Sequence, residues 1–229
     1  MTVPRRDAQA LEAARHELVE YGRRFGMDGL AFGSAGNLSV RVGDLVVITP
    51  SSQPYATIEA DDVCIVAPDG TKLAGRGLIS SEWPMHREVY STSDAGAVVH
   101  THSQEVIALS TTCDELPAIH YAIARVGGPV RVASYTRFGS EGLAHGARAA
   151  LEGRSAALLQ NHGAVTYGSS LAEAYERAAL LEWLAGIYRK ALQYGSPRLL
   201  TTADLDEVVA EVRRRHYGEA ATAIGADAR

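Results

Sequence analysis

The stretch LSVRVGDLVVITP, residues 38–50, contains two β-branched runs on either side of a short turn. This pattern predicts a β-hairpin that turns at VGD, and Pro50 ends the second strand because proline has no N–H to donate to a sheet. The stretch DVCIVAPDGTKLAG, residues 62–75, repeats the pattern around PDG, where proline sets the first turn dihedral and glycine accepts a positive φ. This part of the chain is therefore predicted to form an antiparallel sheet.

Further helices and strands are predicted on both sides of these hairpins. Apolar periodicity and capping residues predict helices at residues 5–25, 80–93, 103–112, 170–195 and 204–218. The first and fourth of these are amphipathic, which is typical of helices that pack on a sheet. Apolar runs predict a buried strand at residues 95–102 and two short strands at residues 156–168, joined by the turn NHG.

The composition predicts one domain without a polyanionic or membrane partner. With 229 residues, 46% of them hydrophobic, the chain can bury one sizeable core, and we expect a domain over residues 1–218 and a disordered tail over residues 219–229. The formal net charge of -5 and the lack of a basic cluster larger than RRR at residues 213–215 argue against nucleic-acid binding. The first residues form no apolar signal segment and no run of about 18 apolar residues occurs, so we expect a cytoplasmic protein.

Three histidines follow apolar runs that are predicted to be strands. His100 and His102 lie in VVHTHS, residues 98–103, where alternate side chains share one face of a strand and stand about 6 to 7 Å apart. His162 occupies the same position after the run AALLQ, so the three imidazoles could converge on one metal ion with an open coordination position. The alternative is that the first two are polar residues at a strand end and that His162 forms a hydrogen bond in a tight turn. The chain has only two cysteines, without CxxC spacing, so a metal would have to use histidine.

Glu82 is the acid that we place beside such a metal. It lies between two serines and a tryptophan rather than on a charged face, and a shielded carboxylate there could exchange protons near neutral pH. The alternative is an ordinary glutamate in the first turn of a helix. The stretches SAGN at residues 34–37, PSS at residues 50–52 and SS at residues 80–81 offer hydroxyl and backbone N–H groups that could surround a phosphate, or they are ordinary turns and caps.

Eight motifs, taken in their order along the chain, resemble the class II aldolase/adducin family: GSAGNLSVR, ITPSSQPY, SSEWPMH, VVHTHS, LPAIHYAIARVGG, SYTRFGS, LLQNHGAVTYG and HYG. The resemblance extends from the first helix to about Gly218. It implies a three-layer α/β/α fold with a central, mostly antiparallel sheet, assembled as a homotetramer with active sites at subunit interfaces. It also implies a sugar-phosphate substrate and one Zn²⁺ ion per subunit.

The resemblance carries functional roles over to residues that match its motifs. The zinc ligands would be His100, His102 and His162, and Glu82 would be the general acid/base that can also touch the metal. The substrate phosphate would be held by Gly36, Asn37, Ser51, Ser52, Ser80 and Ser81. The aldehyde end would be served by Tyr121, Tyr217 and Phe138, with one of the tyrosines reaching in from a neighbouring subunit.

The implied reaction is retro-aldol cleavage of a ketose 1-phosphate of the L-fuculose 1-phosphate type. It gives dihydroxyacetone phosphate and a short aldehyde such as L-lactaldehyde, and zinc would act as the Lewis acid for the enediolate. A Schiff-base route would need a lysine shielded in an apolar pocket, whereas Lys72 lies in a turn and Lys190 in a charged helix.

Related activities stay open. A ribulose-5-phosphate 4-epimerase is disfavoured by Glu82 and the LPAIHY segment; an aldolase of 5-deoxyribulose or methylthioribulose 1-phosphate and a non-catalytic adducin-like module are further alternatives. The chain departs from the family pattern at Ser34 and Ser51, where we expect threonine, and at Ser52, where we expect glycine. Arg137 adds a charge beside Phe138 and leaves the aldehyde preference open.

Overall fold

The computed structural model describes residues 5–215, so the predicted tail, the domain boundary at Gly218 and Tyr217 lie outside the described residues. Its strands are β1 (Asn37–Val42), β2 (Leu45–Ile48), β3 (Cys64–Val66), β4 (Lys72–Ala74), β5 (Ala97–Thr101), β6 (Glu115–Leu116), β7 (Val130–Ala133), β8 (Ala156–Leu159) and β9 (Gly163–Gly168). Its helices are α1 (Arg5–Met27), α2 (Trp83–Thr92), α3 (Gln104–Ser110), α4 (Glu141–Leu151), α5 (Leu171–Tyr194) and α6 (Thr202–Arg214), with short 3₁₀ helices η1 (Ala60–Asp62) and η2 (Tyr121–Val126).

The nine strands form one sheet in the order β4-β3-β2-β1-β5-β9-β8-β7-β6. Among them, only β7 and β8 pair in parallel; the other neighbouring pairs are antiparallel. Both hairpins predicted in the first half of the chain are present, as β1–β2 and β3–β4. The prediction of a mostly antiparallel central sheet is therefore confirmed.

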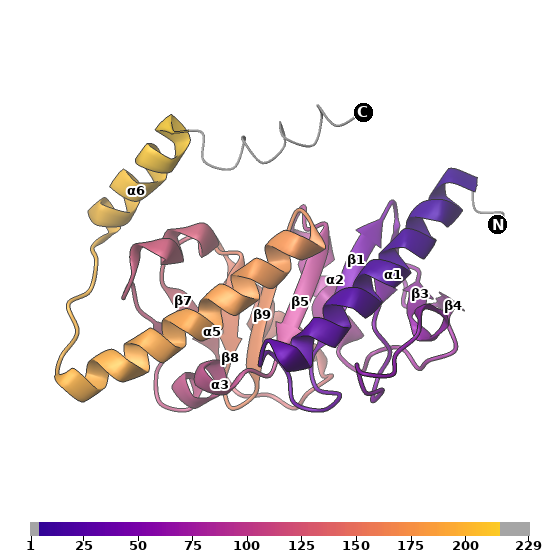
Figure 1. Cartoon of the computed structure of the whole chain (residues 1–229), viewed down its shortest axis with the longest axis horizontal. Coiled ribbons are helices and arrows are strands. Elements are labelled where there is room, and N and C mark those ends of the chain that lie inside the picture. The colour runs from indigo at the N-terminus through magenta and orange to yellow at the C-terminus, as the bar shows by residue number, and fades with distance from the viewer. Residues whose placement is uncertain (1–4, 216–229) are drawn as a thin grey trace.

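Helices cover both faces of the sheet, which confirms the predicted three layers. Helices α1 and α5 lie side by side across the face turned toward the viewer in Figure 1, and the ring centroids of Tyr21 and Tyr175 are 5.0 Å apart between them. Helices α2 and α4 pack on the opposite face, where Met85 and Val89 share a buried cluster with side chains of β5, β8 and β9.

Strand alternation decides which layer each side chain enters. On β5, Val99 faces the cluster under α1 and α5, whereas Val98 faces the cluster under α2 and α4. His100 has the same parity as Val98 and therefore points toward the layer of α2. On β1, Leu38 is in the α1 cluster, so Asn37, its neighbour, also points toward α2. Two strands thus present polar side chains to the beginning of one helix.

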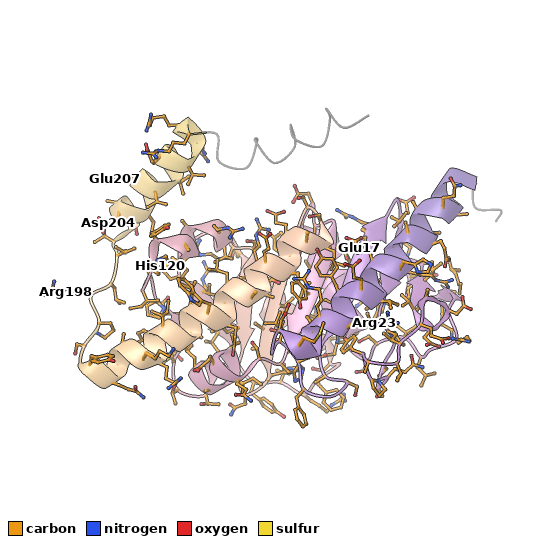
Figure 2. The ribbon with its side chains drawn as sticks, viewed as in Figure 1. Glu17, Arg23, His120, Arg198, Asp204 and Glu207 are labelled. Atoms are coloured by element: carbon orange, nitrogen blue, oxygen red, sulfur yellow. The ribbon has the colours of Figure 1, made fainter. Side chains whose placement is uncertain are left out.

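The last helix of the described residues, α6, touches the body at one side. Leu205 of α6 is 7% exposed in the cluster formed with η2 and α5, whereas Asp204 and Glu207 project from α6 on the side away from the sheet (Figure 2). A reciprocal capping box between Thr201 and Asp204 fixes where α6 begins. None of the helices within residues 5–215 has the length and apolar character needed to cross a membrane.

Candidate active site

Three histidine rings meet where β5 ends and β9 begins. His100 is the fourth residue of β5, His102 follows that strand, and His162 lies in the turn between β8 and β9. Each pair of ring centroids is 4.8 Å apart. The Nε2 atoms of His100 and His102 are 3.0 Å apart. The three imidazoles predicted from two separate motifs are therefore brought to one point by the antiparallel pairing of β5 with β9.

Glu82 joins this group from the start of α2. Its Oε2 atom is 3.0 Å from His100 Nε2, and its Oε1 atom is 3.3 Å from His162 Nε2. Asn37 at the start of β1 donates from Nδ2 to Glu82 Oε2 over 2.9 Å. The helix predicted at residues 80–93 was expected to open with serine; Glu82 takes the N-cap position instead, and Ser80 Oγ accepts from its backbone N–H over 3.2 Å.

The carboxylate and the imidazoles of this group shift one another's pKa values. Burial alone would raise the pKa of Glu82, but the charges and hydrogen bonds of His100 and His162 hold that pKa well below its usual range. Burial and the neighbouring imidazoles lower the pKa of His102 to about 3, so its ring is neutral at physiological pH. A neutral imidazole is the form that binds metal ions.

These residues fit a metal ion. Ligand atoms of Glu82, His100, His102 and His162 all lie within 4.8 Å of one another. The Oε1 atom of Glu82 is buried without a hydrogen-bond partner. His100 Nδ1 lies 2.8 Å from the carbonyl oxygen of Ala164, and a hydrogen bond donated to that oxygen leaves Nε2 free to act as a ligand. Three nitrogen ligands and a carboxylate form a set typical of zinc and related divalent ions.

A pocket of about 320 Å³ opens beside this group. It is lined by all six residues predicted to hold a phosphate, namely Gly36, Asn37, Ser51, Ser52, Ser80 and Ser81, together with Glu82, His102 and His162. None of its lining residues within the described chain is lysine or arginine. An anion bound there would be held by hydroxyl and backbone N–H groups and by the charge of a metal ion.

The residues predicted for the aldehyde end lie in different places. Phe138 lines the pocket and is 59% exposed. Tyr121 begins η2, is 56% exposed and does not line this pocket, so within one chain it is not brought to the group. Arg137 is exposed and does not line the pocket either.

Comparison with known proteins identifies the family. The class II aldolase and adducin N-terminal domain matches residues 16–189. The chain belongs to the class II aldolase and adducin family. A 5-methylthioribulose-1-phosphate/5-deoxyribulose-1-phosphate aldolase of Rhodospirillum rubrum is 37% identical over 209 residues, which cover 90% of this chain and 93% of that protein.

Proteins named L-fuculose phosphate aldolase are also similar. That of Escherichia coli K12 is 39% identical over 171 residues, which cover 74% of this chain and 79% of that protein. A solved structure named L-fuculose 1-phosphate aldolase has a TM-score of 0.84 and 35% identity, and the match covers 88% of this chain and 96% of that chain. The chain is therefore an enzyme, a class II aldolase with lyase activity, as its motifs predicted.

Some residues in and behind this pocket were not predicted from the sequence. Tyr135, Thr136 and Asn161 line the pocket, and His86 lies buried behind Asn37. Asn161 has a φ of 54°, in the left-handed region. This conformation is visible in the structure and was not predicted from the sequence. His86 is the fourth residue of α2. Its place at the end of the SSEWPMH motif was the one sequence feature that linked it to Glu82.

Ser52 gives a test of how the serine loop is built. It adopts a φ of 59° in a position where the family resemblance led us to expect glycine. A side chain in the left-handed region costs about 1 kcal/mol, so Ser52→Gly is expected to raise the free energy of unfolding by up to about 1 kcal/mol. Denaturant unfolding measures this, with Ser51→Gly as the control that should give no gain. A stability loss in Ser52→Gly would show that the Ser52 hydroxyl stabilises the loop more than its backbone strains it.

Proposed function

We propose that this class II aldolase cleaves a ketose 1-phosphate into dihydroxyacetone phosphate and a short aldehyde, with Zn²⁺ as its metal. The observation that carries the proposal is the position of Glu82, whose carboxylate contacts two of three converging histidines at the edge of a hydroxyl-lined pocket. A metal-binding centre next to a hydroxyl-lined pocket suits a substrate that carries both a carbonyl and a phosphate.

Each part of the site has a separate task in this reaction. The serine loops hold the phosphate and so place the substrate carbonyl near the histidines. A divalent cation bound by His100, His102 and His162 supplies Lewis-acid stabilisation of the negative charge that develops when the carbon–carbon bond breaks. The substrate hydroxyl that becomes the aldehyde carbonyl loses its proton. Glu82, a carboxylate at rest, takes up a proton and gives it to the carbon that leaves the broken bond, which completes dihydroxyacetone phosphate. In the condensation direction, the same carboxylate removes that proton.

A 5-deoxyribulose 1-phosphate or 5-methylthioribulose 1-phosphate is the leading substrate. It is supported by the similarity to the Rhodospirillum rubrum aldolase, which extends over 93% of that protein, against 79% for the Escherichia coli L-fuculose phosphate aldolase. Tyr135 and Phe138 line the pocket with aromatic rings, which suit the methyl or thioether end of these substrates better than the hydroxyl that L-lactaldehyde carries beside its methyl group. L-Fuculose 1-phosphate, the substrate type that the motifs first suggested, is the second candidate.

Assembly as a homotetramer in the cytoplasm belongs to the same proposal. Tyr121 is 56% exposed on η2, a position from which it would serve a neighbouring subunit's site and relay the proton that the substrate hydroxyl loses as it becomes the aldehyde carbonyl. Tyr217 is the second candidate for this role. Ribulose-5-phosphate 4-epimerisation is the alternative activity, and the intact Glu/His group disfavours a purely structural adducin-like role.

The testing experiment measures release of dihydroxyacetone phosphate from 5-deoxyribulose 1-phosphate, 5-methylthioribulose 1-phosphate and L-fuculose 1-phosphate. We expect cleavage of at least one of them, lost by about 100-fold or more on chelation and restored by Zn²⁺. L-Ribulose 5-phosphate is tested in parallel for epimerisation. Cleavage that resists chelation would overturn the metal route, and epimerisation without cleavage would overturn the aldolase assignment.

A further inference from the structure

A series of four hydrogen bonds, three of them buried, runs between β1 and α2 and ends on Glu82. Tyr90 OH and Ser39 Oγ are 2.8 Å apart, and Ser39 Oγ and His86 Nδ1 are 2.6 Å apart. His86 Nε2 bonds to Asn37 Oδ1, and Asn37 Nδ2 donates to Glu82 Oε2. Polar side chains thus form a continuous path from the last turn of α2 to the carboxylate of the site.

The residue spacing along β1 and α2 creates this path. Asn37 and Ser39 are alternate residues of β1 and share one face, while Glu82, His86 and Tyr90 are four residues apart along α2 and share one side. His86 and Ser39 are both 0% exposed, and Asn37 and Glu82 are each 5% exposed. Water therefore does not compete for these hydrogen bonds, and each partner must be satisfied by the next.

The donors and acceptors can be assigned in only one direction. A carboxylate accepts only, so Asn37 must present its amide NH₂ to Glu82 and its carbonyl oxygen to His86. His86 must then carry a hydrogen on Nε2. With a neutral ring, its Nδ1 accepts from the Ser39 hydroxyl, whose oxygen accepts from Tyr90. In each hydrogen bond of this series, the acceptor lies nearer to Glu82 than the donor does.

We infer that His86 is a positioning residue that locks the Asn37 amide with its NH₂ group toward Glu82 and so fixes the direction of the Glu82 carboxylate. An asparagine amide can rotate by half a turn, which would place its oxygen against the carboxylate; the Nε2–H of His86 stabilises only the productive orientation. Besides His100 and His162 of the metal group, Asn37 is the side chain that donates to the Glu82 carboxylate. His86 does not line the pocket and acts only through Asn37.

The consequence rests on the proposed function, because a misdirected Glu82 would slow proton transfer more than substrate binding. His86→Leu removes the donor and is expected to lower kcat by about 10- to 100-fold, with KM changed by less than about 3-fold. His86→Gln can place its amide N–H where Nε2–H stood, and is expected to stay within about 5-fold of the wild-type kcat. If kcat falls in His86→Leu and stays near the wild-type value in His86→Gln, the loss is due to the missing N–H donor.

A control separates positioning from general damage to α2. Val89 lies on the same helix, is 2% exposed and packs in the cluster with Met85, and it takes no part in this series of hydrogen bonds. Val89→Ala is expected to lower the melting temperature while leaving kcat within about 2-fold of wild type. If His86→Leu fails to fold, Ser39→Ala serves instead, because it frees His86 Nδ1 and leaves the imidazole in place.

A second measurement does not depend on turnover. Nitrogen-15 NMR of protein labelled at histidine is expected to show His86 as the neutral Nε2–H tautomer in wild type, and in Ser39→Ala a mixture of tautomers. An Nδ1–H tautomer in wild type, or equal kcat values in wild type and His86→Leu, would overturn the inference. If wild type cleaves no ketose phosphate, the proposed function fails on its own, and the tautomer still decides whether His86 orients Asn37.

Discussion

Replacing Glu82 by glutamine is expected to lower kcat for ketose 1-phosphate cleavage by about 1000-fold. The amide has nearly the same shape and can still accept from Asn37 Nδ2, but it has no carboxyl proton to give to the carbanion carbon. The three histidines remain as ligands, so the protein should still bind one Zn²⁺ ion per subunit. Turnover is measured by release of dihydroxyacetone phosphate, and bound zinc by elemental analysis.

Glu88 provides the matched control on the same helix. It pairs with Arg148 at 3.1 Å, and it belongs neither to the metal group nor to the residues that line the pocket. Glu88→Gln is therefore expected to keep kcat within about 2-fold of wild type. A Glu82→Gln enzyme with near-normal turnover would remove Glu82 from proton transfer. A Glu82→Gln protein without zinc would instead make Glu82 a necessary ligand.

Local sequence patterns predicted the parts of the fold that are determined by residues close together in the sequence. The hairpins around Gly43 and PDG follow from turn chemistry and strand periodicity, and both are present. The histidines could be placed at strand ends for the same reason. Their convergence could only be a hypothesis, because it depends on β5 pairing with β9, and these strands are separated in sequence by more than sixty residues.

The region from residue 114 to residue 151 shows where local signals fail. The structure places β6, η2, β7 and α4 there, although no helix or strand was predicted. Strand β6 has only two residues, and α4 contains two glycines, Gly142 and Gly146, which weaken a helical pattern. Packing against α2 and β8 supplies what the local sequence lacks. His86 was missed for a related reason. Its role depends on hydrogen bonds to side chains of β1, which lies more than forty residues earlier in the sequence.

Gly163→Ala is expected to be the most damaging small substitution at the metal group. Gly163 begins β9 directly after His162, and a Cβ atom at this position would lie 1.9 Å from the carbonyl oxygen of Thr101 and 3.4 Å from the Cα atom of His102. Both neighbours are backbone atoms of β5 and the residue after it, so they cannot move aside as a flexible side chain would. The two strands would have to separate at the point where the histidines meet. We expect a loss of about 3 kcal/mol in the free energy of unfolding.

The same substitution should weaken metal binding, since it moves His102 and His162 apart. We expect zinc affinity to fall by at least about 10-fold, as measured by competition with a chromophoric chelator at a temperature where the variant is folded. Gly146→Ala in α4 is the control, because its Cβ would come no closer than 3.7 Å to another atom and alanine favours a helix. That variant should be as stable as wild type or slightly more so. If Gly163→Ala kept both wild-type stability and wild-type zinc affinity, the close approach of β9 to β5 could not be what brings the histidines together.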